Sequence, residues 1–300
     1  MNRSVPGRSI LWLSILPQAL TLQAADLRID HVTVAGRDLH KLERAIEGVG
    51  LRSEYGGQHA NHATEMSIAS FADGSYIELI AIQPSADPAA VRQHAWSRFL
   101  ESDAGPCAWA IRSSGVDAEV QRLRSAGIEV KPPNHSGRTR PDGHRLDWET
   151  AQVGLDGNGT FFPFLIRDFT PREKRAFPSG RPSVSDYTGI ARVVIAVRDL
   201  QSSVARYRKA LDLPEAQRQS DTELGAELAW FSNTPVILAA PLNSRSWLAQ
   251  RVNAFGEAPC AFVLGRRGAG KHDGARTSVW FGRTITWFDQ EKLGWRLGVE

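Results

Sequence analysis

Two polar side chains, His31 and Glu78, interrupt apolar segments that resemble β-strands. Successive strand side chains point to opposite faces, so the histidine lies opposite the valines of segment 29–34, and the carboxylate lies opposite the isoleucine and leucine of segment 76–80. If the apolar faces pack beneath helices, both polar groups project into a concave pocket. Imidazole and carboxylate suit Zn, Mn, Fe or Ni, so we expect a divalent metal there. A buried His–Glu hydrogen bond without metal is the alternative.

Three further histidines are candidates to complete such a site. His59 and His62 lie between the two segments, and His62 has the parity of the strand that follows it, which would direct it to the concave face. His144 begins a strand-like run that also carries Trp148, so it is interpreted as pocket wall and substrate contact. The other histidines have helix or loop surroundings and are predicted to be solvated; they are His40, His94, His135 and His272.

Arginine and aromatic side chains gather around the Pro-Asp-Gly sequence at 141–143. The guanidinium groups of Arg138, Arg140 and Arg145 could bind a carboxylate or phosphate, or could be solvated groups that protect a sheet edge. Aromatic side chains could line an apolar pocket or belong to the core. We take as further substrate-binding candidates Trp109, Trp148, Arg140 and Phe164.

The elements that must position these residues recur along the chain. Segment 29–39 matches 190–200, each an apolar run that ends in Arg-Asp-Leu, where the Asp suits a helix N-cap. The repeating unit is a strand, a helix and three strands. In the first copy the helix is expected at 40–48 and the later strands at 51–55, 64–71 and 76–82. In the second copy the helix is expected at 116–126 and the strands near Ile128 and at 107–113, 144–153 and 161–169.

Four such units, the last truncated, account for the chain after its first 25 residues. Segment 171–188, rich in proline and charge, has the composition of a linker. We therefore predict a site-bearing domain of two units at 26–170, the linker at 171–188, and a second half at 189–300.

Three short motifs, in this order, resemble those of the vicinal oxygen chelate superfamily and its glyoxalase-like members. They are Ile29-Asp30-His31-Val32, Gly56-Gly57-Gln58-His59 and Asp73-Gly74-Ser75-Tyr76-Ile77-Glu78. The resemblance covers roughly residues 27–300. It implies an α+β fold in which repeated βαβββ units form incomplete barrels with helices on the outer face. It also implies a metal site that takes a His and a Glu, or similar ligands, from each of two units.

The chain departs from this pattern in the partner units. Ala108 and Arg192 stand at the position of the histidine, and Phe164 and Leu238 fall near the position of the glutamate. None of these side chains is a normal metal ligand. Because catalytic zinc commonly has three protein ligands, a nearby histidine must supply the third, or no metal binds. The second half, 189–300, is accordingly interpreted as a degenerate copy.

The resemblance implies that His31 and Glu78 are catalytic and that a bound metal would chelate vicinal oxygens of a small substrate. That chemistry supports a lyase or isomerase. A metal-free, ligand-sequestering protein is the alternative, and a ring-cleaving dioxygenase is the weaker one. Without a metal, Glu78 could still act as a general base, its pKa raised by burial. The incomplete ligand set argues against a glutathione-dependent lactoylglutathione lyase.

Composition limits the partners. The chain has 300 residues and a formal charge of only +3, with basic residues scattered, which argues against nucleic acid binding.

Arg3 and Arg8 precede an apolar run at 10–22, the arrangement of a secretory signal, so residues 1–25 are predicted to be a signal peptide. The protein would then be periplasmic or secreted, and otherwise cytoplasmic. That run is too short for an integral membrane helix. Paired units can assemble within one chain or between two chains, so the sequence is also compatible with a homodimer.

Overall fold

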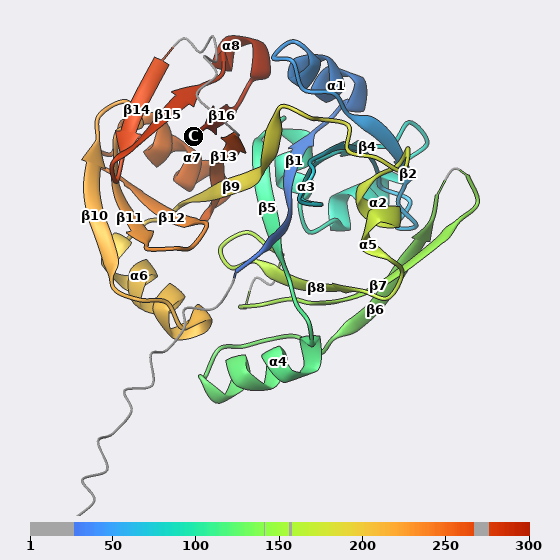
Figure 1. Ribbon diagram of the computed structural model, residues 1–300, viewed down its shortest axis with the longest axis horizontal. Helices are drawn as coiled ribbons and strands as arrows, with labels where there is room; N and C mark the ends of the chain where they lie inside the picture. Colours follow the sequence, from blue (N-terminus) through green and yellow to red (C-terminus); the bar gives the residue numbers. More distant parts are fainter. Residues whose placement is uncertain (1–26, 141, 156–157, 267–275) are drawn as a thin grey trace, which may run out of the picture.

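The computed structural model describes residues 27–140, 142–155, 158–266 and 276–300. Two curled sheets lie side by side in it, one from each half of the chain (Figure 1). The strands of the first sheet are β1 (Ile29–Gly36), β2 (Glu54–Gln58), β3 (Thr64–Ser70), β4 (Tyr76–Ile82), β5 (Gly105–Arg112), β6 (Asn134–Thr139), β7 (Arg145–Ala151) and β8 (Phe164–Asp168). The strands of the second sheet are β9 (Tyr187–Ala196), β10 (Ala216–Asp221), β11 (Ala226–Phe231), β12 (Val236–Pro241), β13 (Ala258–Arg266), β14 (Arg276–Trp280), β15 (Arg283–Trp287) and β16 (Arg296–Val299).

Helices connect and flank these strands. The first half contains α1 (Leu39–Glu47), α2 (Pro88–Gln93), α3 (Ser97–Glu101), α4 (Val116–Ser125) and α5 (Arg172–Ala176). The second half contains α6 (Leu200–Leu211), α7 (Trp247–Phe255) and α8 (Gln290–Leu293). Among the residues that the structure describes, no helix is both long and apolar enough to span a bilayer.

The two sheets share one topology. The strand order is β2-β3-β4-β1-β5-β8-β7-β6 in the first sheet and β10-β11-β12-β9-β13-β16-β15-β14 in the second. In each, the central pair is antiparallel, and each central strand is parallel to the last strand of its own unit. This is the repeated strand, helix and three-strand plan, so the α+β expectation of repeated units in curled half-barrels is confirmed.

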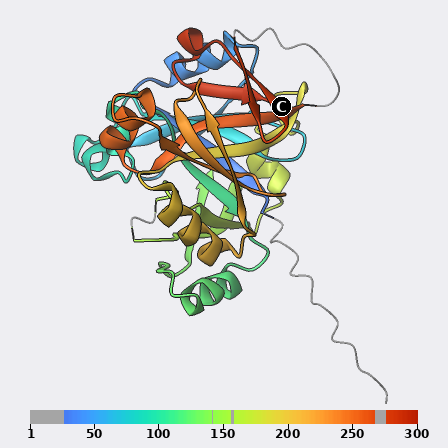
Figure 2. The ribbon, with the colours of Figure 1, turned by 90° about the vertical axis from the view of Figure 1, so that its left-hand side faces the viewer.

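Local sequence explains where the two equivalent helices begin. The carboxylate of Asp38 accepts a hydrogen bond from the backbone N–H of Lys41 at 2.9 Å, and Asp199 accepts one from Ser202 at 2.6 Å. Each Asp is thus the N-cap that the Arg-Asp-Leu sequence predicts. At one end of the molecule α4 and α6 lie together (Figure 2), and Arg122 donates across them to the carbonyl of Ala210 at 2.7 Å.

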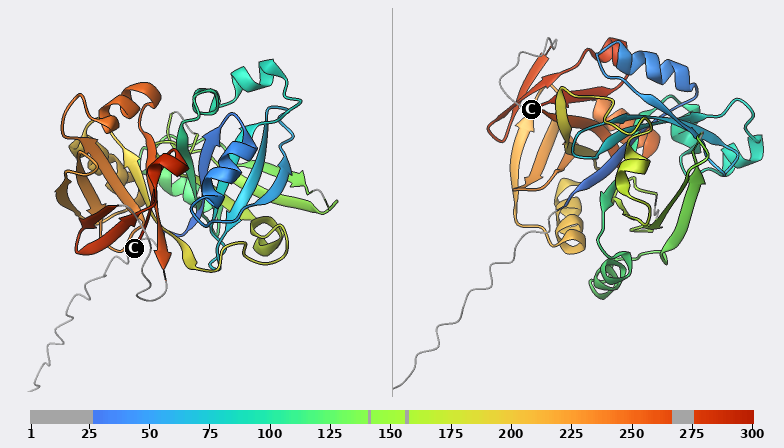
Figure 3. Two further views of the ribbon diagram at one scale, coloured as in Figure 1. Left: turned by 90° about the horizontal axis from the view of Figure 1, so that it is seen from above. Right: turned by 45° about the vertical axis from the view of Figure 1, so that its right-hand side comes forward.

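The apolar faces of β1 and β4 pack as their alternation predicts. Val32 and Ile77 are buried in one hydrophobic cluster with Leu42 of α1. The same cluster contains Val193 of β9 and Phe262 of β13. One core therefore joins both halves, which lie side by side when the molecule is seen from above (Figure 3, left).

Two segments differ from expectation. The region near Ile128 forms only a single bridge, between Val130 and Val153, and β6 lies further along the chain. The sequence of β6, Asn-His-Ser-Gly-Arg-Thr, has no apolar alternation that could have indicated a strand. The segment expected to be a linker contains α5, which packs on the first sheet. The predicted signal peptide and His272 lie outside the described residues.

Candidate functional site

A cavity of about 410 Å³ lies on the concave face of the first sheet. Glu78 of β4 lies in it between two histidines. The Nε2 atom of His31, on β1, is 3.9 Å from Oε2 of Glu78, and the Nε2 atom of His59, just after β2, is 3.7 Å from Oε1. The full lining comprises His31, His59, Asn61, Met66, Tyr76, Glu78, Ile80, His94, Trp96, Ser136, Gly137, Arg138, Trp148, Thr150, Gln152, Phe164, Ile166 and Arg175.

A buried ion network orients His31. Its Nδ1 atom is 2.6 Å from Oδ1 of Asp30, a carboxylate that also pairs with Arg175 and Arg172. Burial favours the neutral carboxyl, but Arg175, the hydrogen bond from His31 and Arg172 hold the pKa of Asp30 well below its ordinary value. The ionised carboxylate accepts the Nδ1 proton; in the neutral ring, Nε2 of His31 then presents its lone pair to the cavity.

His59 is held in a comparable way. Its Nδ1 atom is 2.8 Å from the hydroxyl oxygen of Thr64, and its Nε2 atom faces Glu78. Burial lowers the pKa of His59; Glu78 opposes this shift and Arg138 adds to it. If Nδ1 donates to the threonine, the neutral ring directs a second lone pair at the same carboxylate. Two lone pairs and a carboxylate then face one another, an arrangement that a cation between them would stabilise.

Aromatic and basic groups complete the wall. The ring of Tyr76 stacks on His31 with centroids 4.9 Å apart, and Phe164 meets the same imidazole edge-on at 5.3 Å. Burial raises the pKa of Tyr76, so its hydroxyl stays protonated. His94 accepts a hydrogen bond at Nδ1 from the backbone of Trp96 at 3.1 Å, and burial lowers its pKa. The neutral ring of His94 therefore carries its proton on Nε2.

Four predicted site residues do not line this cavity. His62 is exposed because its backbone is in the left-handed region (φ 56°), which ends the strand parity before β3. His144 is exposed in the turn before β7, so it does not extend the face of Trp148. Trp109 is fully buried on the opposite face of β5, in the shared core. Arg140 lines a neighbouring depression instead.

Other residues of the site were not predicted from the sequence. His94 was expected to be solvated, yet it lines the cavity from the end of α2. Arg138 was considered only as one of three arginines near a turn, and its burial was not foreseen. Asp30 belongs to the quoted Asp-His motif, and its position next to His31 was the available signal for a carboxylate that orients an imidazole. No local pattern marked Arg175.

The corresponding positions of the second sheet carry different side chains. Arg192 stands where His31 does, and it pairs with Glu300 at 3.1 Å. The β9–β12 register pairs Val194 with Ile237, as Thr33 pairs with Glu78, so Ile237 rather than Leu238 is the equivalent of the glutamate. Buried apolar side chains fill the interior; they include Leu228, Val263, Trp280, Ile285 and Trp287.

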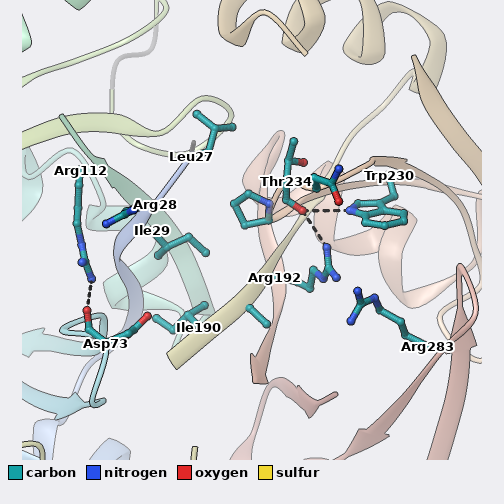
Figure 4. Close-up of a pocket in the computed structure, with 13 residues that line it drawn as sticks. Leu27, Arg28, Ile29, Asp73, Arg112, Ile190, Arg192, Trp230, Thr234 and Arg283 are labelled. Carbon is teal, nitrogen blue, oxygen red and sulfur yellow. Dashed lines mark hydrogen bonds between the residues drawn. The ribbon is translucent and has the colours of Figure 1, made fainter. Parts of the chain in front are cut away.

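A separate cleft of about 480 Å³ lies at the seam between the halves (Figure 4). Arg112 donates to the carbonyl of Asp73 at 2.9 Å, and Arg192 donates to the carbonyl of Thr234 at 2.8 Å. Trp230 donates to the same Thr234 oxygen at 3.1 Å. The residues that line this cleft include none of the predicted site residues, and these arginines already have partners. We therefore place the candidate site in the concave cavity.

The potential metal ligands lie slightly further apart than the ligands of a bound metal would. Within residues 27–266 and 276–300, apart from the short gaps, no group of three or more His, Cys, Asp or Glu side chains already has metal-binding geometry. Tetrahedral ligands with bonds near 2.1 Å would be about 3.4 Å apart. The two Nε2 to carboxylate distances, 3.9 and 3.7 Å, exceed this by a few tenths of an ångström. The donor types fit a divalent metal, and rotation of side chains would have to close the gap.

Comparison with known proteins agrees with the fold. A family model described as a glyoxalase-like domain matches residues 29–211. A crystal structure of a hypothetical protein from Staphylococcus aureus is 13% identical, with 91% of this chain and 99% of that chain covered and a TM-score of 0.64. A mutant of 4-hydroxymandelate synthase from Streptomyces coelicolor is 14% identical, with 80% and 71% covered and a TM-score of 0.52. No curated protein matches the chain. At these identities the likenesses establish the fold alone.

Proposed function

Because the chain belongs to the glyoxalase-like domain family, we propose that it is a lyase or isomerase that holds a divalent metal and acts on a small, oxygen-chelating substrate. His31, His59 and Glu78 would be the metal ligands. The observation that carries the proposal is that the Nε2 atoms of both histidines face the two oxygens of one carboxylate inside one cavity. Two imidazoles and a carboxylate suit Zn, Mn, Fe or Ni and leave positions open for substrate.

The residues around the ligands have separate tasks in this proposal. The bound metal would supply a Lewis acid that stabilises negative charge on a substrate oxygen. Asp30 would hold His31 in the tautomer with a free Nε2 atom, and Thr64 would do the same for His59 by accepting its Nδ1 proton. His94 presents a proton on Nε2 at the cavity wall. Phe164 and Tyr76 cover the His31 ring and exclude water from that side.

Metal analysis tests the proposal. The native protein, the variant Glu78→Gln and the control Glu65→Gln are each loaded with Zn, Mn, Fe or Ni, freed of loosely bound ions and measured by elemental analysis. Glu65 lies on the neighbouring strand β3, and its carboxylate accepts a hydrogen bond from the Tyr55 hydroxyl outside the cavity. We expect about one metal per chain in the native protein and the control, and a loss on the order of tenfold or more in Glu78→Gln.

Equal metal in Glu78→Gln and the native chain would place the metal elsewhere. A folded native protein that retains none of the four metals would contradict the proposal and leave metal-free ligand binding as the function. The observation that favours this alternative is that the potential ligands lie further apart than in a formed metal site.

A ring-cleaving or other oxygenase is a second candidate, and His59 is the observation that favours it. With His59 facing Glu78, the donor set becomes two histidines and one carboxylate, the set typical of non-haem Fe(II) oxygenases. Strong selection for Fe(II) in the same metal analysis, with oxygen uptake on adding candidate catechols, would favour this function over a lyase or isomerase.

A further inference from the structure

Two arginines line the cavity, and their surroundings differ. Arg175 is 4% exposed and is paired with Asp30 at 2.9 Å and with Asp168 at 2.5 Å. Arg138 is 6% exposed, and its Nη1 atom donates to the backbone carbonyl of Gly56. Among the described residues, no carboxylate oxygen lies within 4.0 Å of the Arg138 guanidinium. Arg175 is therefore directly paired with carboxylates, whereas Arg138 is attracted by Glu78 only from beyond 4.0 Å.

A buried cation that has no direct ion pair is unfavourable, because burial removes the hydration that stabilises its charge. A guanidinium has five N–H donors, and the Gly56 carbonyl takes only one of them. The structure shows no other hydrogen bond of the Arg138 guanidinium among the described residues, and its other nitrogen atoms are not fully enclosed. Because Arg138 lines the cavity, a ligand there can approach them. An anion that enters the cavity can pair with them in the forked geometry that guanidinium and carboxylate share.

The approach to Arg138 is also basic. A depression of about 220 Å³ adjoins the cavity, and Arg138 and Arg175 line both. Its other charged side chains are Arg140, Lys174 and Asp142, the last paired with Arg140 at 2.9 Å. Cations therefore outnumber carboxylates on this side, which raises the local concentration of anions.

Part of the remaining lining is apolar and suits the body of an aromatic ligand. Trp148 and Phe164 contribute aromatic rings, and Met66 and Ile80 contribute aliphatic surface. A volume of about 410 Å³ is within the range of sites for small molecules. Aromatic rings of a ligand gain from offset or edge-on contact with such walls.

We propose that the cavity binds a small aromatic carboxylate, with the carboxylate paired to Arg138 and the ring against Trp148 and Phe164. This names a substrate class for the proposed function, and it rests on that function only for the reaction at His31, His59 and Glu78. The ion pair with Arg138 requires no metal.

Benzoate and its neutral analogue benzamide provide the test, because they differ in charge and little in shape. Binding of each is measured by calorimetry to the native protein, both metal-loaded and metal-stripped, and to Arg138→Met, Arg138→Lys and Arg145→Met. Arg145 is a matched control, since it lies opposite Thr139 on the next strand and is 58% exposed. Circular dichroism checks the fold of each variant.

We expect benzoate to bind the native protein about 10- to 100-fold more tightly than benzamide. Arg138→Met should weaken benzoate by a similar factor and leave the two ligands nearly equal, while Arg145→Met should change neither. Arg138→Lys should keep part of the preference for benzoate, because it retains the charge and loses the fork. If Arg138→Met does not fold, the native ligand pair and Arg138→Lys decide the matter.

The proposal is overturned if neither ligand binds, if both bind the native protein equally, or if Arg138→Met binds benzoate as the native protein does. Loss of benzoate binding in Glu78→Gln but not in Arg138→Met would also overturn it, since the carboxylate would then contact the metal position. A preference for benzoate that persists in the metal-stripped protein supports the Arg138 site even where metal analysis contradicts the proposed reaction.

Discussion

His59 and His40 differ in their surroundings, and their pKa values are therefore shifted in opposite directions. Burial lowers the pKa of His59 below its ordinary value of 6.5, with Glu78 opposing and Arg138 adding to the shift. His40 is exposed on α1, and its hydrogen bond and attraction to Glu43 raise its pKa. At pH 7 the ring of His59 is therefore neutral, the form that binds a metal.

We predict that His59 makes the protein less stable as pH falls below about 6.5. The unfolded chain takes up a proton at that pH, whereas the folded chain resists protonation until its lower pKa is reached. The unfolded state thus binds more protons in this window, so the free energy of unfolding decreases as the pH is lowered. His59→Gln removes the effect, so its stability should decline less between pH 7 and 5 in urea unfolding experiments.

NMR titration checks the same prediction directly. The ring proton of His59, assigned with His59→Gln, should titrate below 6.5, and that of His40 should titrate above it. A pKa of His59 above 6.5 in the metal-free protein would show that attraction to Glu78 exceeds the effect of burial.

At the scale of elements, α5 anchors the segment between the halves to the first sheet beside the cavity. Arg175 on this helix pairs with Asp30 of β1 and Asp168 of β8, and it also donates to the hydroxyl of Tyr76 on β4. One guanidinium therefore joins three strands, and the position of α5 over the first sheet is visible in Figure 3 (right). The segment expected to be a spacer thus supports the orientation of His31.

Removing this guanidinium should be costly. Arg175→Met leaves buried carboxylates short of a counter-charge, so we predict a loss of about 3 kcal/mol in the free energy of unfolding. Arg167→Met is the control, because Arg167 is 45% exposed and faces Glu149 at 3.5 Å; it should cost less than about 1 kcal/mol. Denaturant unfolding measures both. Equal losses would mean that the network around Asp30 is not the basis of stability here.

At the scale of the whole molecule, the two halves share one core. Trp109 of β5 and Phe262 of β13 belong to the same buried cluster, and Tyr207 of α6 donates to the carbonyl of Phe161 in the first half. Arg251 of α7 likewise donates to the carbonyls of Ala104 and Pro106. The second sheet therefore packs against the first sheet through a shared core and hydrogen bonds between the halves.

We predict that the first half does not fold alone. A fragment of residues 27–186 would expose the apolar side chains that pack against Val193 and Phe262, so it should lack a cooperative thermal transition and a dispersed NMR spectrum. Residues 27–300 provide the control and should unfold in a single transition. A sharp transition in the fragment would show that its own contacts suffice.

The sequence by itself determined the repeated plan and the faces of the two site strands. Apolar alternation set which sides of β1 and β4 are buried against helices, and Asp38 and Asp199 marked the helix starts. These features are local: a strand repeats every two residues, and a cap acts within three. They were sufficient to predict that His31 and Glu78 share a concave face.

Only the tertiary structure decided what joins them. His94 and Arg138 reach the cavity from α2 and from the outer strand β6, and Arg175 supports it from α5. His62 turns outward at one left-handed residue, although its parity suggested otherwise. Periodicity specifies the face that a side chain takes within its own element. The curl of the sheet and the path of its connections determine which distant faces meet, and no local pattern encodes that distance.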